Sequence, residues 1–261
     1  MNDVMLDLRS DKIIESLKNG TRLDARKVDE YRNVSIELDI SKNAEGSAKA
    51  KIGETEVIAG VKLSPGKPYP DSPAEGTISL GAELLPMASP LFEQGPPDEN
   101  ATELARVVDR GIRESKCIDF KDLCIREKEL VWIAFVDFYV INDDGNLFDC
   151  SALASIAALK HTKIPKIEED AIVKGEFAGK LKVKKTPILT TFAKIANAVV
   201  LDPNSAEMHA MDGRFSCAST EDDLFSAFQK GGRASFTAGD IDWCLETSLT
   251  KSKDLRKILK E

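Results

Sequence analysis

The order in which two hydrophobic periodicities follow each other is the feature that most constrains how this chain can fold. Apolar and polar residues alternate over 34–40, which predicts a half-buried strand. Two further runs, 47–52 and 56–63, predict a hairpin, and residues 77–85 predict a fourth strand. Such a succession of strands before the long central helix favours an α+β fold.

Turn-forming residues mark where these elements begin and end. Residues 64–75 contain four prolines and are expected to form an exposed loop, because proline cannot donate to a central strand ladder. An N-terminal helix is expected from about Asp7 to Lys18, with apolar residues such as Leu8 on one face and Gly20 just past its end. Ser10 is an alternative start for a shorter helix.

The strongest helical period covers residues 100–116. Its apolar residues recur on one side: Leu104, Val107, Val108, Gly111 and Ile112. Asn100 and Glu103 resemble the two ends of a capping box at its start. A strand is then expected at 130–141, and Asp149 is placed to cap an alanine-rich helix over 151–161.

The second half repeats the succession of strands followed by a helix. The expected strands are 188–195, 198–201, 215–219 and 224–229. Residues 162–186 form a connection with some strand character, and Gly231-Gly232 interrupts the chain. Thr237 begins a capping box, after which a final helix runs to about Lys260. The chain is therefore predicted to have an α+β fold in two lobes.

Composition restricts the classes of function. With 261 residues, of which 42% are hydrophobic, the chain is long enough for one or two ordinary cores. It has no apolar run of transmembrane length and no secretion signal, so a cytoplasmic protein without a membrane partner is expected. Five scattered cysteines and two histidines predict neither disulfides nor a metal centre. The net charge of −8 restricts any RNA contact to a local basic patch.

Such a patch is predicted on the helix over 100–116. Arg106, Arg110, Arg113 and Lys116 are spaced by three and four residues, which places them on one side of a helix. They form either an ordinary solvated face or a row that binds phosphate groups, since the arginine fork is suited to phosphate oxygens.

Two other charged clusters favour structural roles. Asp202, Glu207 and Asp212 could bind a cation, but the segment Asp-Pro-Asn-Ser at 202–205 favours a turn. Arg22, Asp24 and Arg26 alternate in an extended segment and predict ion pairs that fix that segment.

Several segments, in their order along the chain, resemble the RNase PH family of phosphorolytic exoribonucleases. They are GTRLDARKVDEYRNV, GSAKAKIGETEVIAGV, ATELARVVDRGIRESK, VDFYVINDDGNLFDCSALASIAAL and VVLDPNSAE. The resemblance implies an RNase PH-like fold, with two lobes of mixed β-sheet and packed helices and a first lobe like ribosomal protein S5 domain 2. It implies an N-terminal segment at 1–30 and domains at 31–165 and 186–261.

The residues that would perform the chemistry of this family are missing. Active members have a phosphate-holding arginine at the start of the central helix, and the alignment places that position at Asn100 or Ala101. They also have two aspartates six residues apart. Asp202 matches the first of these, but Met208 stands at the second. The resemblance therefore predicts no catalytic residue, no metal site and no cofactor in this chain.

Within the family, the chain most resembles the non-catalytic ring subunits of archaeal exosomes. This implies a hexameric ring in which three copies alternate with three catalytic RNase PH-like subunits, with RNA-binding cap subunits on one face. It also implies that single-stranded RNA is bound by central-helix arginines, namely Arg106, Arg110 and Arg113. A homo-oligomeric enzyme and a scaffold without RNA contact are the alternatives.

Overall fold

The computed structural model describes residues 2–259, and of residues 2–9 only the backbone. The elements, in order, are α1 (Asn2–Lys18), β1 (Val34–Leu38), β2 (Gly46–Ile52), β3 (Thr55–Gly66), β4 (Thr77–Leu84), α2 (Glu99–Glu114), the 3-10 helix η1 (Phe120–Leu123), β5 (Cys124–Arg126), β6 (Leu130–Asn142), α3 (Leu147–Lys160), β7 (Lys163–Glu168), β8 (Ala171–Lys180), β9 (Ile188–Ile195), β10 (Ala198–Leu201), α4 (Ser205–Ala210), β11 (Gly213–Ser219), β12 (Phe225–Gly232) and α5 (Ala238–Ile258). The predicted α+β class is confirmed.

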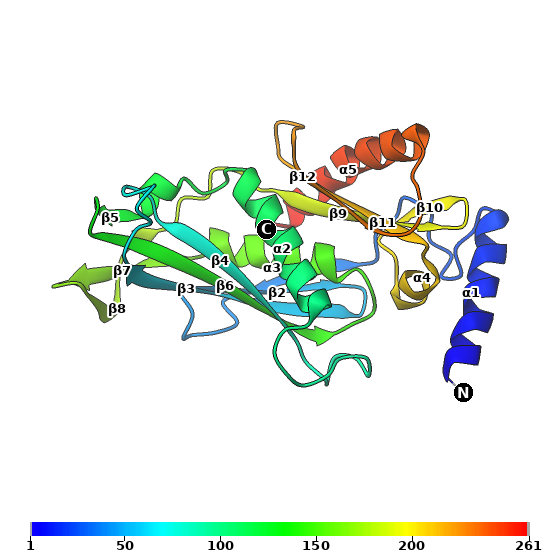
Figure 1. Ribbon diagram of the computed structural model, residues 1–261, viewed down its shortest axis with the longest axis horizontal. Coiled ribbons are helices and arrows are strands. Elements are labelled where there is room, and N and C mark those ends of the chain that lie inside the picture. The colour runs from blue at the N-terminus through cyan, green and yellow to red at the C-terminus, as the bar shows by residue number, and fades with distance from the viewer. Residues whose placement is uncertain (1, 260–261) are drawn as a thin grey trace.

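These elements stack in four layers (Figure 1). The first sheet has the strand order β1-β2-β3-β6-β4, with β5 paired to β6, and the second has the order β10-β9-β11-β12. Helices α2 and α3 lie between the sheets, since α3 packs against β2, β3 and β9 and α2 packs against β4 and β12. Helix α5 covers the other face of the second sheet. The two lobes therefore share an interior formed by two helices.

The first sheet is mixed, because β4 runs parallel to β6 while its other pairs are antiparallel. Side chains alternate along β6 between two environments. Val136, Phe138 and Val140 are fully buried on the side of the helices. Phe135 and Tyr139 point to the opposite face and are exposed. One face of this sheet thus forms the core, and the other is open.

Helix α3 is surrounded by protein on all sides. Every residue from Phe148 to Leu159 is buried. Its many alanines and serines allow close approach, and a Cβ atom added at Gly46 of β2 would lie 2.4 Å from the carbonyl oxygen of Ala158. A helix between two sheets needs no polar face, which explains why its apolar residues show no one-sided pattern.

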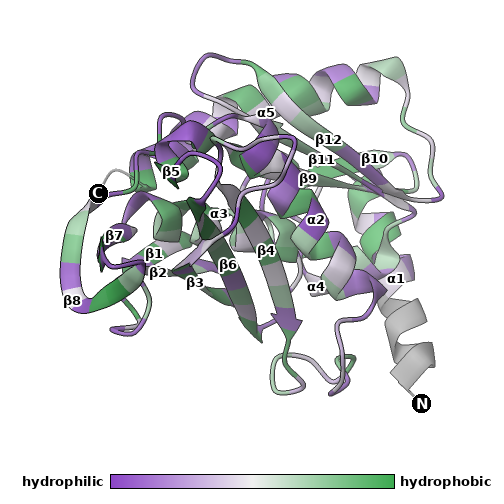
Figure 2. Ribbon diagram, turned by 60° about the vertical axis from the view of Figure 1, so that its left-hand side comes forward, coloured by the Kyte–Doolittle hydropathy of each residue, from purple (hydrophilic) through white to green (hydrophobic). Residues whose placement is uncertain are grey.

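The second sheet is antiparallel throughout. Phe215 and Cys217 of β11 join a cluster with residues of α5, whereas Arg214 of the same strand reaches α2 and α3. Helix α5 alternates between hydrophilic and hydrophobic segments, as expected for an outer layer (Figure 2). At the edge of this lobe, Ile13 and Leu17 of α1 are buried against β9 and β10.

Several predicted boundaries are wrong. Helix α1 begins at Asn2, so Ser10 lies inside it, and the side chain of Leu8 lies outside the described residues. Helix α5 ends at Ile258, and the predicted end at Lys260 also lies outside them. Strand β12 continues through Gly232, so the two glycines end a strand.

Three segments form regular structure where loops or connections were expected. Strand β3 continues to Gly66, with Pro65 opposite Trp132 of β6. The pairing of β3 with β2 ends at Val61 of β3. Pro65 therefore has a neighbouring strand only on the side of β6, and its missing N–H removes no hydrogen bond to β2. Residues 163–180 form the hairpin of β7 and β8, and residues 205–210 form the short helix α4, which begins at the last residue of the predicted turn.

Candidate functional site

Asp202, the residue that matches the first family aspartate, is fully buried at the end of β10. Its carboxylate accepts hydrogen bonds from Arg26, Arg32 and Asn146 at 2.8–2.9 Å. Burial alone would raise the pKa of Asp202, but the hydrogen bonds from Arg32 lower it. The carboxylate is thus ionised and saturated with donors, which leaves it unsuited to moving a proton or binding a cation.

Glu207, the second acid of this cluster, is also paired. Its Oε1 atom accepts from Nε of Arg22 at 2.8 Å, and both side chains are buried. Glu207 also completes a capping box with Asn204 at the start of α4. Asp24 pairs with Arg26 at 2.8 Å, as the predicted role of this extended segment requires. These ion pairs fix the segment between α1 and β1 onto the second sheet.

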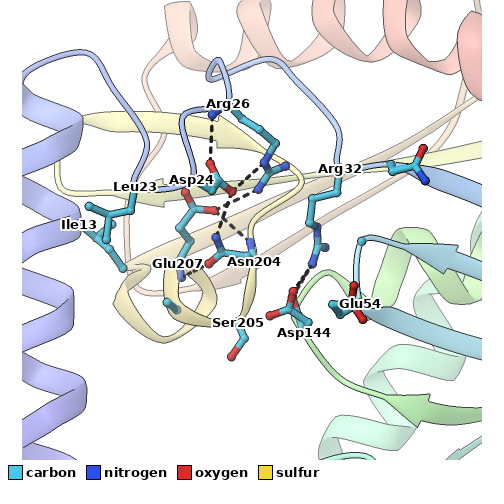
Figure 3. Close-up of a pocket in the computed structure, with 13 residues that line it drawn as sticks. Ile13, Leu23, Asp24, Arg26, Arg32, Glu54, Asp144, Asn204, Ser205 and Glu207 are labelled. Atoms are coloured by element: carbon cyan, nitrogen blue, oxygen red, sulfur yellow. Dashed lines mark hydrogen bonds and ion pairs between the residues drawn. The ribbon is translucent and has the colours of Figure 1, made fainter.

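A cavity of about 530 Å³ lies beside this network (Figure 3). Its charged walls include Asp24, Arg26, Arg32, Asp144 and Glu207. Arg32 forms a 3.1 Å ion pair with Asp144, and Arg26 is held by Asp24 and Asp202. Because both arginines are already neutralised by carboxylates, the cavity offers little attraction to a phosphate group.

The helix that begins next to Asp202 is α3. Asn146 precedes it at a positive φ of 54° without capping it, and instead donates to Asp202 and Asp149. The predicted cap at Asp149 is therefore wrong, because α3 begins at Leu147. Asp149 accepts from the hydroxyl of Tyr31 at 2.6 Å and from the backbone N–H of Thr191 at 3.0 Å. Burial raises the pKa of Asp149 to about 7, against these hydrogen bonds.

The position of Asp202 corrects the predicted place of the missing phosphate-holding residue. A phosphate that reacts near Asp202 would need the helix N-terminus beside Asp202, which is that of α3. Residues 146–151 contain no arginine or lysine, and Asp149 places a carboxyl group there. Asn100 and Ala101, between which the alignment placed the loss, lie in the first turn of α2, where Asn100 is exposed and Ala101 is buried. The position that lacks a basic residue is therefore at the start of α3, and not at the start of α2.

The start of α2 serves to join the lobes. Asp98, not Asn100, is its N-cap and accepts from the N–H of Ala101 at 2.7 Å. Glu103 does not complete a capping box. It forms a 2.6 Å ion pair with Arg214 of β11, whose guanidinium lies 3.9 Å from the ring centre of Phe148 in α3. One arginine thus connects the second sheet with both interior helices.

The predicted arginine row divides into free and engaged residues. The side chain of Arg106 is exposed and has no hydrogen bond or ion pair among the described residues. Arg110 is exposed and makes one long contact, 3.5 Å, with the side chain of Gln229. Arg113 pairs with Asp109 at 2.9 Å, donates to the carbonyl of Ile78 and lies over the ring of Phe120. The first two are therefore the residues available to a ligand.

Neither a metal site nor a membrane segment is found in the part of the chain that the structure describes. No three side chains among His, Cys, Asp and Glu are grouped there to hold a metal ion. Met208, at the second aspartate position, is half-buried in α4 and has no group that binds a cation strongly. No helix within the described range is long and apolar enough to cross a membrane.

Comparison with known proteins shows the family. Residues 30–165 match the model for domain 1 of the 3′ exoribonuclease family, RNase PH, and residues 185–251 match its domain 2. This chain belongs to the RNase PH family of 3′ exoribonucleases, and the RNase PH-like fold that the resemblance implied is confirmed.

Relatives of similar length carry one name. Exosome complex component Rrp42 of Thermococcus gammatolerans is 44% identical over 99% of this chain and 96% of that protein. Its namesake from Archaeoglobus fulgidus is 43% identical over 99% of this chain and 98% of that protein. A chain of the Archaeoglobus fulgidus exosome with RNA bound to the active site superimposes with a TM-score of 0.92, at 44% identity, over 97% of this chain and 98% of that one. A chain of an archaeal exosome core gives 0.89, at 40% identity, over 100% and 99%.

Sequence reasoning missed most of the residues that hold the junction of the lobes together. Tyr31, Arg32, Asn146 and Arg214 were not singled out as site residues, and most of their partners lie far away along the chain, 170 residues in the case of Arg32 and Asp202. An available signal was the tyrosine-arginine pair at 31–32, one residue before the first strand, since a solvated linker would need neither residue.

Proposed function

We propose that this chain is a non-catalytic subunit of an archaeal exosome, a complex with phosphorolytic 3′–5′ exoribonuclease activity. The observation that carries the proposal is the saturation of Asp202, whose carboxylate is filled by two arginines and an asparagine. The absence of a basic residue in 146–151 supports it, because phosphorolysis needs a held phosphate. The relatives named exosome complex component Rrp42 support the assignment to an exosome.

The second part of the proposal is a role in binding RNA. Arg106 and Arg110 present two uncompensated charges one helical turn apart, which suits neighbouring phosphates of a single strand. Arg113 is a weaker candidate, because its guanidinium is engaged within the chain. In the proposed ring, Arg106 and Arg110 hold RNA beside the active site of a catalytic RNase PH-like partner and help to complete that site.

The remaining features of the proposal follow from the resemblance, except the cytoplasmic location, which follows from the composition. Three copies alternate with three catalytic subunits in a hexameric, cytoplasmic ring that carries RNA-binding cap subunits. The chain contributes domains at 31–165 and 186–261. Such a subunit can be acidic overall, since RNA meets only a small part of its surface and protein partners meet much of the rest.

Phosphorolysis assays separate the proposal from its main alternative. The chain alone, the catalytic subunit alone and the mixture are each supplied with single-stranded RNA and inorganic phosphate, and nucleoside diphosphates are measured. We expect none from this chain alone and the most from the mixture. Diphosphate release by the purified chain would establish the alternative, a homo-oligomeric enzyme. Equal activity of the catalytic subunit with and without this chain would favour a scaffold.

A further inference from the structure

The outer face of β6 carries a carboxylate between two aromatic side chains. Phe135, Asp137 and Tyr139 are alternate residues of this strand and project to the same side. Phe135 is 38% exposed and Tyr139 is 43% exposed. Isolated aromatic residues at a surface are ordinary, but here two of them flank one acid on an open sheet face. This group of three residues is called the β6 triplet below.

The carboxylate of this triplet has no partner. The side chain of Asp137 forms no hydrogen bond or ion pair among the residues that the structure describes. Burial raises its pKa, and no cation nearby opposes that shift. The lysines of the neighbouring strands are already engaged, Lys62 with Glu45 at 2.6 Å and Lys49 with Glu37 at 2.8 Å. A partly desolvated carboxylate without a counter-charge is unfavourable, and a cation would relieve it.

The strands on either side leave this carboxylate accessible. In the register of the sheet, Asp137 stands opposite Gly60 of β3 on one side and Gly81 of β4 on the other. A Cβ atom at Gly81 would lie only 2.5 Å from Oδ1 of Asp137. Two glycines thus form a trough across the sheet, with the carboxylate in it and an aromatic residue before and after it along β6.

The outer face of the first sheet is hollowed by a second cavity beside the β6 triplet. A space of about 490 Å³ is lined by Phe135, Ile133 and Ser79 of the sheet, by Tyr69 of the proline-rich loop and by Arg113 of α2. The ring of Tyr69 is 62% exposed. Phe135 therefore connects the β6 triplet with a cavity that holds a further aromatic side chain, Tyr69, and reaches Arg113 near the C-terminal end of α2.

We propose that the β6 triplet receives an arginine side chain of the neighbouring catalytic subunit, an inference that rests on the proposed function. The guanidinium would pair with Asp137 and stack on Phe135 or Tyr139, both of which favour arginine over other side chains. RNA is the wrong occupant, because an uncompensated carboxylate repels phosphate. The catalytic subunit is favoured over a cap subunit because Arg113 of α2 lines the adjoining cavity, and the proposed function places Arg106 and Arg110 of the same helix beside the active site of that subunit.

A photo-cross-link identifies the occupant directly. Tyr139→p-benzoyl-phenylalanine keeps an aromatic ring at this place, and the full ring with caps and RNA is irradiated after assembly. We expect the cross-link to join this chain to the catalytic subunit. A cross-link to a cap subunit or to RNA, or no cross-link in an intact ring, would overturn the inference.

Two substitutions test the chemistry of the contact. Asp137→Asn should weaken association with the catalytic subunit at least about tenfold, since a desolvated arginine loses its counter-charge. Gly81→Ala retains every charge but displaces the carboxylate, and should weaken association in the same direction. Glu246→Gln, an exposed carboxylate on α5, is the matched control and should assemble normally. Thermal unfolding of each isolated chain confirms that it is folded.

The outcomes distinguish this inference from the proposed function. If the unmodified chain does not associate with the catalytic subunit, both fall. If the ring forms and is active, but Asp137→Asn and Gly81→Ala assemble within about twofold of the unmodified chain, only the docking of an arginine at the β6 triplet is refuted.

Discussion

The junction around Asp202 and the exposed side of α2 are both rich in arginine, but they use it in opposite ways. At the junction, Arg22, Arg26 and Arg32 are buried or nearly so and bind carboxylates and carbonyls from distant parts of the chain. On α2, Arg106 is exposed and unpaired within the described residues, and Arg110 makes only a long contact.

The difference shows what each region can do. A buried arginine with a carboxylate partner holds parts of a protein together, and losing one partner leaves a costly unpaired charge. An exposed arginine adds little stability but remains free to bind an anion. In this chain, the arginines around Asp202 are engaged in structural ion pairs, whereas the arginines for which we propose an RNA contact lie on the neighbouring helix α2.

The largest effect is expected from removing the acid at the joint. Asp202→Ala leaves Arg26 and Arg32 without their shared carboxylate and should lower the free energy of unfolding by about 3–5 kcal/mol. Urea titration of the isolated chain measures this. Glu246→Ala on α5 is the control and should change it by less than about 0.5 kcal/mol. A comparably small loss for Asp202→Ala would show that the joint is not structural.

The double substitution Arg106→Ala with Arg110→Ala should act on RNA and not on stability. In the assembled ring we expect RNA affinity to fall about tenfold or more, and the salt dependence to become shallower by about 0.7 for each lost phosphate contact. Fluorescence anisotropy at several salt concentrations measures both. Arg126→Ala, an exposed arginine away from α2, is the control. Unchanged binding in an intact ring would establish the scaffold alternative.

The buried carboxyl of Asp149 gives the joint a dependence on pH. Its pKa is raised from 3.8 to about 7, so between these values the folded chain binds more protons than the unfolded chain. This contribution to stability is therefore present at low pH and is lost as pH rises from about 4 to about 7. Relative to the unmodified chain, Asp149→Asn should gain more than about 1 kcal/mol over this range. Parallel pH profiles of the two unfolding free energies would refute the assignment.

The smallest effect is expected at Arg113, which is intermediate between the buried arginines of the junction and the exposed arginines of α2. Arg113→Ala removes the ion pair with Asp109, the bond to the carbonyl of Ile78 and the contact with Phe120, and should cost roughly 0.5–1 kcal/mol of stability. RNA affinity should change less than for Arg106→Ala under the same conditions. If Arg113→Ala lowers RNA affinity as much as Arg106→Ala does and leaves stability unchanged, Arg113 also binds RNA.

The sequence was most informative where a local pattern decides the structure. Helix α2 follows from its one-sided apolar period, and the strands of the first lobe follow from alternation and turn residues. Helix α4 was missed because its capping residues also favour turns, and the extension of β3 was missed because Pro65 lies where β2 has already ended. Local rules describe competing outcomes at such places, and tertiary packing selects between them.

The chemistry of the site was predicted in outline but not in position. The loss of catalytic residues could be proposed from aligned motifs, yet the missing basic residue was placed at Asn100 or Ala101. Only the three-dimensional structure shows that Asp202 meets the start of α3, through Asn146, and that its remaining partners come from the linker before β1. Contacts between segments so distant in the chain leave no periodic pattern to detect.

The ion pair between Glu103 and Arg214 affects the direction in which the arginines of α2 project. Glu103 and Arg106 lie on the same helix, and successive residues of a helix are turned by about 100° about its axis. An anchor at Glu103 therefore fixes the rotational angle of α2, and with it the direction in which Arg106 and Arg110 project. The second lobe therefore orients the two arginines proposed to bind RNA, even though it need not contact RNA itself.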